Sequence, residues 1–116
     1  MLRPQPLIQH RPRTHVPALA NNFPCAVPMR VSVCVSGVDG HGRAFSEHTT
    51  IEFGTPTEMM FSSALPLQHG DKVRIINQDG SFDVLTSVVA TRYRNGKSAV
   101  AVRIDDLSSS LPLKKF

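Results

Sequence analysis

The sequence predicts an all-β fold, a six-stranded antiparallel β-barrel, from three observations. Apolar and polar residues alternate with a period of two along much of residues 30–104, which is the spacing that separates the two faces of a strand. Asp79-Gly80 and Asn95-Gly96 are tight-turn pairs that mark hairpins. No pattern of alternating strands and helices is visible, and closing the strands into a barrel would remove exposed strand edges.

Length and composition limit the class of protein. The 116 residues suffice for one domain, and 41% apolar with 19% charged residues allows a packed core. No apolar run approaches the roughly 18 residues of a membrane helix. Prolines and arginines interrupt the N-terminus where a signal peptide would be apolar. We therefore expect a cytoplasmic protein that has no contact with a membrane.

Charge and proline divide the chain into three parts. Residues 1–21 are basic and proline-rich, and proline disfavours helix, so they predict a flexible or extended arm. Its arginines suit either a solvated tail or an electrostatic arm that closes over an anion. Residues 22–104 hold the predicted barrel. Residues 105–116 form a tail in which 106–111 fits a short helix or turn. The net charge of +4 is the sum of a mildly acidic body and basic ends.

The first three predicted strands are separated by breaks rich in glycine and proline. The first, residues 30–37, carries valine at every second position and is therefore half-buried. The second covers residues 46–53, and the third is the short run 59–61. We expect Met59 or Met60 to be exposed and to serve as interface residues for a partner.

The last three predicted strands cover residues 72–77, 81–93 and 98–104. Val88 and Val89 stand side by side in the fifth strand, which predicts a β-bulge because a regular strand would send the two side chains to opposite faces.

The polar residues form no catalytic or metal-binding motif. Cys25 and Cys34 lack the spacing of a zinc site and are expected to be reduced thiols. The five histidines include no i, i+4 pair, although His48 is a candidate neighbour of Cys34 across the first hairpin. The glycine-rich stretch 37–42 lacks the Lys-Ser/Thr ending of a phosphate loop. We expect a protein that is not an enzyme and holds no cofactor or metal.

Several fold markers follow one another in a familiar order. They are the segments 27–28, 37–45, 65–67, 70–75 and 99–104. This order resembles the PilZ domain family, small bacterial β-barrels of which the best-known members bind cyclic di-GMP. The resemblance implies a PilZ-like barrel over residues 22–104, acting as a regulatory or adaptor module in bacterial cyclic di-GMP signalling.

This sequence departs from the ligand signature of that family. The family carries two arginines separated by three residues before the first strand, and Asp/Asn-x-Ser-x-x-Gly at the end of the second. Guanidinium groups stack on guanine and fork onto its edge or onto phosphate. The arginines would fall at Asn22 and Ala26, and the second motif at Glu52, Gly54 and Thr57. The resemblance therefore predicts weak or absent cyclic di-GMP binding and a role through contacts with a protein partner.

Charged residues near these positions or on the strand faces are the candidates for ligand contact. They are Arg11, Arg13, Arg30, Glu52, Arg92 and Arg94. Arg11 and Arg13 would replace the missing arginine pair from the arm. Arg92 and Arg94 alternate with Tyr93 and therefore share a face.

A basic stripe is the basis of the alternative function. Arg74 and Arg103 would extend the face of Arg92 and Arg94 into a surface for nucleic acid, unless Asp83, Asp105 and Asp106 balance these charges. The sequence has one tyrosine and no tryptophan, so few side chains can stack on bases. Nucleic acid is therefore the less favoured partner.

Overall fold

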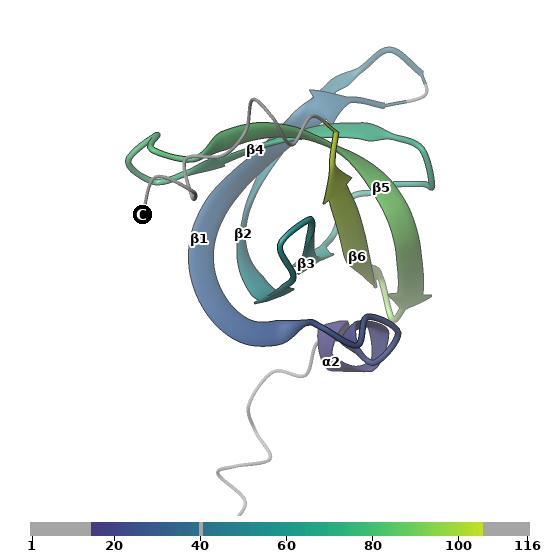
Figure 1. Cartoon of the computed structure of the whole chain (residues 1–116). Coiled ribbons are helices and arrows are strands. Elements are labelled where there is room, and N and C mark those ends of the chain that lie inside the picture. The colour runs from purple at the N-terminus through teal and green to yellow at the C-terminus, as the bar shows by residue number, and fades with distance from the viewer. Residues whose placement is uncertain (1–14, 40, 106–116) are drawn as a thin grey trace, which may run out of the picture.

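The computed structural model describes residues 15–39 and 41–105, and these form a closed barrel of six strands (Figure 1). The strands follow the order β1-β2-β3-β6-β5-β4 around the barrel, and each neighbouring pair is antiparallel. The strands are β1 Val27–Val38, β2 Ala44–Gly54, β3 Glu58–Ser63, β4 Lys72–Asn77, β5 Asp83–Arg94 and β6 Lys97–Ile104. The predicted fold class is confirmed.

The barrel interior is filled by the apolar halves of the alternating strands. Val33 and Val35 of β1, Phe61 of β3 and Val100 and Val102 of β6 are buried together in it. Their polar neighbours in sequence face outward, because successive side chains of a strand point to opposite faces. The alternation read from the sequence is thus the one that builds the core.

The two Gly-containing turns behave differently. Asn95 and Gly96 both have positive φ, 53° and 83°, between the paired residues Arg94 and Lys97, which makes the expected two-residue hairpin. The loop around Asp79-Gly80 is wider, and β5 begins at Asp83 rather than at residue 81. Asn77 Oδ1 accepts a hydrogen bond from the Phe82 amide and stabilises this wider loop.

The fifth strand contains the expected bulge. Its register against β6 shifts between Val88 and Ala90. Val88 lies in the barrel interior, whereas Val89 and Ala90 pack on the outside of the barrel. The bulge therefore lets β5 serve two apolar clusters.

The second cluster lies under a helix that corrects the prediction for the arm. The segment before residue 21 is not extended throughout, because Val16–Ala20 form the short helix α2, with Val16, Leu19 and Ala20 buried. Pro17 lies in its first turn, where proline is tolerated because the amide there has no intrahelical partner. Burial of three side chains against the barrel stabilises a helix too short to form alone.

The prediction that Met59 or Met60 is exposed was wrong. Met59 is buried in the barrel interior and Met60 is buried beneath α2. Consecutive strand residues face opposite sides, so an apolar pair stays buried only where both sides are covered. Here the core covers one side and α2 the other (Figure 1).

Candidate functional site

The first half of β1 is an incompletely paired strand edge. Residues 33–37 of β1 pair with β2 on one side and with β4 on the other. Residues 27–32 pair with β2 alone among the residues that the structure describes. An unpaired edge presents backbone donors and acceptors to which a further strand can add.

Apolar side chains are exposed along this edge. Val27 is 54% exposed, Met29 40% and Val31 37%. Val31 lies opposite the core residue Ile51, and the Met29 methyl group covers Gly54. The row thus continues the core-facing side of β1 past the end of β4, where no described strand covers it. We call Val27, Met29 and Val31 the β1 apolar row.

Sequence reasoning missed the β1 apolar row, although a signal was present. The alternation of Val31, Val33 and Val35 extends backward to Val27, but the expected strand began at residue 30. The exposure of the row depends on where β4 ends against β1, which is a long-range property. Only the alternation could have been found from the sequence.

The structure brings together the two segments of the family's ligand signature. Val27 pairs with Gly54, and Ala26 and Phe53 both pack against the apolar cluster under α2. Asn22 is exposed in the turn that follows the helix. The segments are therefore adjacent, but the side chains facing each other there are apolar rather than guanidinium groups.

The predicted ligand-contact residues do not form one site. Arg30 lies in a register shift of β1 opposite the half-buried Glu52. Arg92 and Arg94 are exposed at the far end of β5. Strands β3 and β6 separate β2, which carries Glu52, from β5, which corresponds to roughly 14 Å along the sheet. Strand β4 separates β1, which carries Arg30, from β5, which corresponds to roughly 10 Å. Arg11 and Arg13 lie outside the described residues.

Ion pairs break up the expected basic stripe. Arg74 makes a bidentate pair with Asp83, at 2.9 and 2.7 Å. Arg103 pairs with Glu58 at 3.0 Å. Two of the four stripe arginines are thus neutralised by carboxylates, Arg74 by one of the acids that the sequence offered as balance and Arg103 by Glu58, which was not among them.

These carboxylates are ionised at neutral pH. Hydrogen bonding to Arg74 holds the pKa of Asp83 below its ordinary value. Burial raises the pKa of Glu58, but hydrogen bonds from Thr55 and Arg103 outweigh burial and leave the pKa lowered. The two pairs therefore persist under physiological conditions as a structural feature of the barrel wall.

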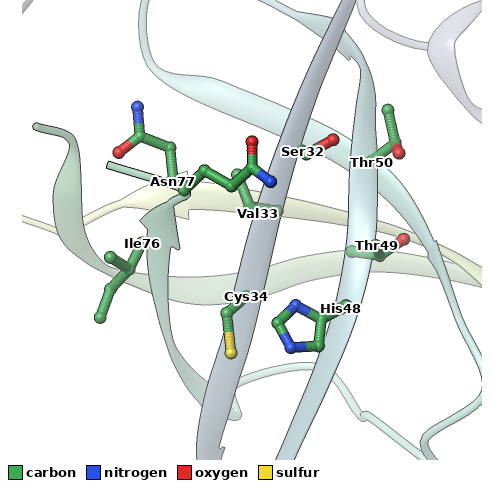
Figure 2. A pocket seen from close by; sticks show the side chains of 9 residues that line it. Ser32, Val33, Cys34, His48, Thr49, Thr50, Ile76 and Asn77 are labelled. Carbon is green, nitrogen blue, oxygen red and sulfur yellow. The ribbon is translucent and has the colours of Figure 1, made fainter. Parts of the chain in front are cut away.

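A groove lined by residues of β1, β2 and the end of β4 contains the Cys34–His48 pair. Cys34 lies directly opposite His48 in the strand register, and Figure 2 shows the two side chains next to each other. Both cysteines are free thiols. Within residues 15–39 and 41–105, no three His, Cys, Asp or Glu side chains are grouped as a metal site requires. The pair supplies two ligands at most.

Comparison with known proteins returns no family. No protein-family model matches the chain, and no curated protein matches it in sequence. Across the described residues, no helix has the length and apolar character needed to cross a membrane.

Proposed function

We propose that this chain is a PilZ-like regulatory or adaptor module of the bacterial cyclic di-GMP signalling type, which binds cyclic di-GMP weakly or not at all and acts through protein contacts. The observation that carries the proposal is the β1 apolar row on an incompletely paired edge. The fold and the order of sequence markers support the PilZ-like assignment.

The weak-binding part of the proposal rests on the residues at the two signature segments. Ala26 and Phe53 are engaged in the cluster under α2, and the Met29 methyl group fills the space beside Gly54. Polar ligand groups placed there would lose water without gaining hydrogen bonds, which costs free energy. The side chains at these two segments thus pack within the domain and do not offer a binding site for guanine.

Calorimetric titration with cyclic di-GMP tests this part. We expect no saturable heat at micromolar ligand, and no rise in Tm, because a ligand that binds only the folded state must raise it. A PilZ domain known to bind cyclic di-GMP serves as the positive control. Micromolar or tighter affinity would contradict the proposal, and an Arg11→Ala, Arg13→Ala double variant would then show whether the arm supplies the missing guanidinium groups.

The protein-contact part follows from the chemistry of the edge. An added strand would gain backbone hydrogen bonds along residues 27–32, except for a donor at Pro28, which has no amide hydrogen, and would bury the β1 apolar row. Arg30 is exposed on the same segment and favours a carboxylate on the incoming strand. The partner is therefore an extended segment of another protein with alternating apolar residues and at least one acidic residue.

Two matched double variants test the docking edge. Val27→Lys with Met29→Lys places two charges on it, and Lys on an edge opposes strand addition. Val38→Lys with Leu85→Lys changes two exposed apolar residues elsewhere, which are 58% and 52% exposed. In cross-linking experiments with the full chain, the amount of partner protein cross-linked to the chain is measured. We expect the first double variant to reduce this recovery about tenfold and the second to leave it unchanged. Equal recovery by both would contradict docking at this edge.

Nucleic acid is the weaker alternative on this structure. Arg74 and Arg103 are engaged by Asp83 and Glu58, so they are not free to neutralise phosphates. Phosphate-driven binding would also weaken steeply as salt rises, whereas docking of an apolar strand would not. The salt dependence of partner recovery separates these two functions.

A further inference from the structure

A cleft opens between α2 and the hairpin that joins β5 to β6. Its volume is about 550 Å³. It is lined by His15, Pro17, Ala18, Ser62, Arg94, Asn95 and Lys97. Figure 1 shows α2 beside this hairpin, at the end of the barrel where β6 begins. No carboxylate is among the described residues that line the cleft, so its polar groups are cationic or neutral.

Among the described cations of the barrel some form ion pairs, whereas others, such as Arg30, Arg92 and the two cations of the cleft, form none. Lys72, Arg74 and Arg103 each pair with a carboxylate. The side chains of Arg94 and Lys97 have neither an ion-pair nor a hydrogen-bond partner within residues 15–39 and 41–105. They are also directly opposite each other in the strand register.

Like charges in this position repel one another. Opposed residues of an antiparallel pair have Cβ atoms about 4.5–5.5 Å apart, and like charges there are destabilising. The tight turn at Asn95-Gly96 holds this register in place. An anion between the two side chains would offset this repulsion. Binding of an anion at the hairpin is therefore favourable.

We propose that this cleft binds the phosphate group of a small phosphorylated molecule. The planar guanidinium of Arg94 can form two parallel hydrogen bonds to phosphate oxygens, and the ammonium of Lys97 adds a point charge. The Ser62 hydroxyl, the Asn95 amide and the His15 imidazole supply further donors around the same space. Such a set of donors suits a tetrahedral oxyanion.

The rest of the ligand is indicated by the size and the apolar wall of the cleft. Ligand sites for small molecules span about 300–1,000 Å³, and this cleft lies within that range. Pro17 and Ala18 line the side formed by α2. A phosphate ester with a compact apolar or planar group fills both the cationic part and the apolar part of the cleft, whereas inorganic phosphate fills only the cationic part.

Titration of the full chain with phenyl phosphate, followed by amide NMR shifts, tests the proposal. We expect saturable shifts at Ser62, Asn95 and Gly96, and an affinity about tenfold weaker for the Arg94→Gln, Lys97→Gln double variant. The matched control is Lys72→Gln with Arg74→Gln, which removes two cations outside the cleft and is expected to change the affinity less than about twofold. All four positions are exposed, and NMR spectra of the free variants verify that each is folded.

Other outcomes would overturn the proposal. They are equal weakening in both double variants, no saturation by about 10 mM phenyl phosphate, or inorganic phosphate binding as tightly as the ester. A single-stranded oligonucleotide that binds more tightly than phenyl phosphate, with steep salt dependence, would assign the cleft to nucleic acid instead. Because the β1 apolar row contributes nothing to this cleft, the result is independent of the proposed adaptor function.

Discussion

Replacing Leu19 by alanine is expected to lower the free energy of unfolding by about 2–4 kcal/mol. Leu19 is 1% exposed and packs with Met60, Ala99 and Ala101 on the outside of the barrel. A five-residue helix has little stability of its own, so its position depends on this burial. Truncating the side chain leaves a cavity beneath α2 in addition to the lost burial. Urea denaturation followed by circular dichroism measures the change.

The control is the same truncation at an exposed leucine. Leu85 is 52% exposed on the outer side of β5, and Leu85→Ala is expected to change stability by less than about 0.5 kcal/mol. A similar small effect for Leu19→Ala would show that α2 adds nothing to the barrel. The predicted difference therefore measures how far the helix is an integral part of the domain.

The alternation of side chains is why the fold could be predicted from the sequence. Val31, Val33 and Val35 show the face of β1, and Asn95-Gly96 specifies a hairpin by local geometry alone. Helix α2 escaped prediction because five residues contain little more than one helical turn, too few for a periodic pattern. Pro17 was read as opposing helix, but in a first turn it is compatible with one.

The candidate sites depend on long-range relations that the sequence does not display. The β1 apolar row is exposed because β4 stops pairing at Val33, and no local pattern predicts that register. Arg94 was a candidate because it alternates with Arg92 in the sequence. Only the three-dimensional structure shows that Arg74 has a carboxylate beside it, whereas no carboxylate is described beside Arg94. Thus the strands and the barrel were predictable, but the register at which β4 stops pairing with β1 was not.

Alanine at position 37 is expected to destabilise the protein by about 1–3 kcal/mol. Gly37 pairs with Val73 where β1 meets β4, and a Cβ added there would lie 2.7 Å from the Lys72 carbonyl oxygen. That oxygen belongs to the backbone, so the two strands must separate to accept the methyl group. Guanidinium denaturation measures the loss, and hydrogen exchange is expected to accelerate at the β1–β4 contact more than at β1–β2.

Gly54→Ala is the matched control for this change. A Cβ at Gly54 would lie 2.8 Å from the Met29 methyl carbon, which is the end of a flexible side chain and moves at little cost. We expect a change of less than about 0.5 kcal/mol, because alanine also restricts the unfolded chain. Equal losses of stability for the two variants would show that the β1–β4 contact is not tightly closed.

If the contact opens as expected in Gly37→Ala, the unpaired edge grows from residues 27–32 toward residue 38. The variant should then self-associate more readily than the Gly54→Ala control.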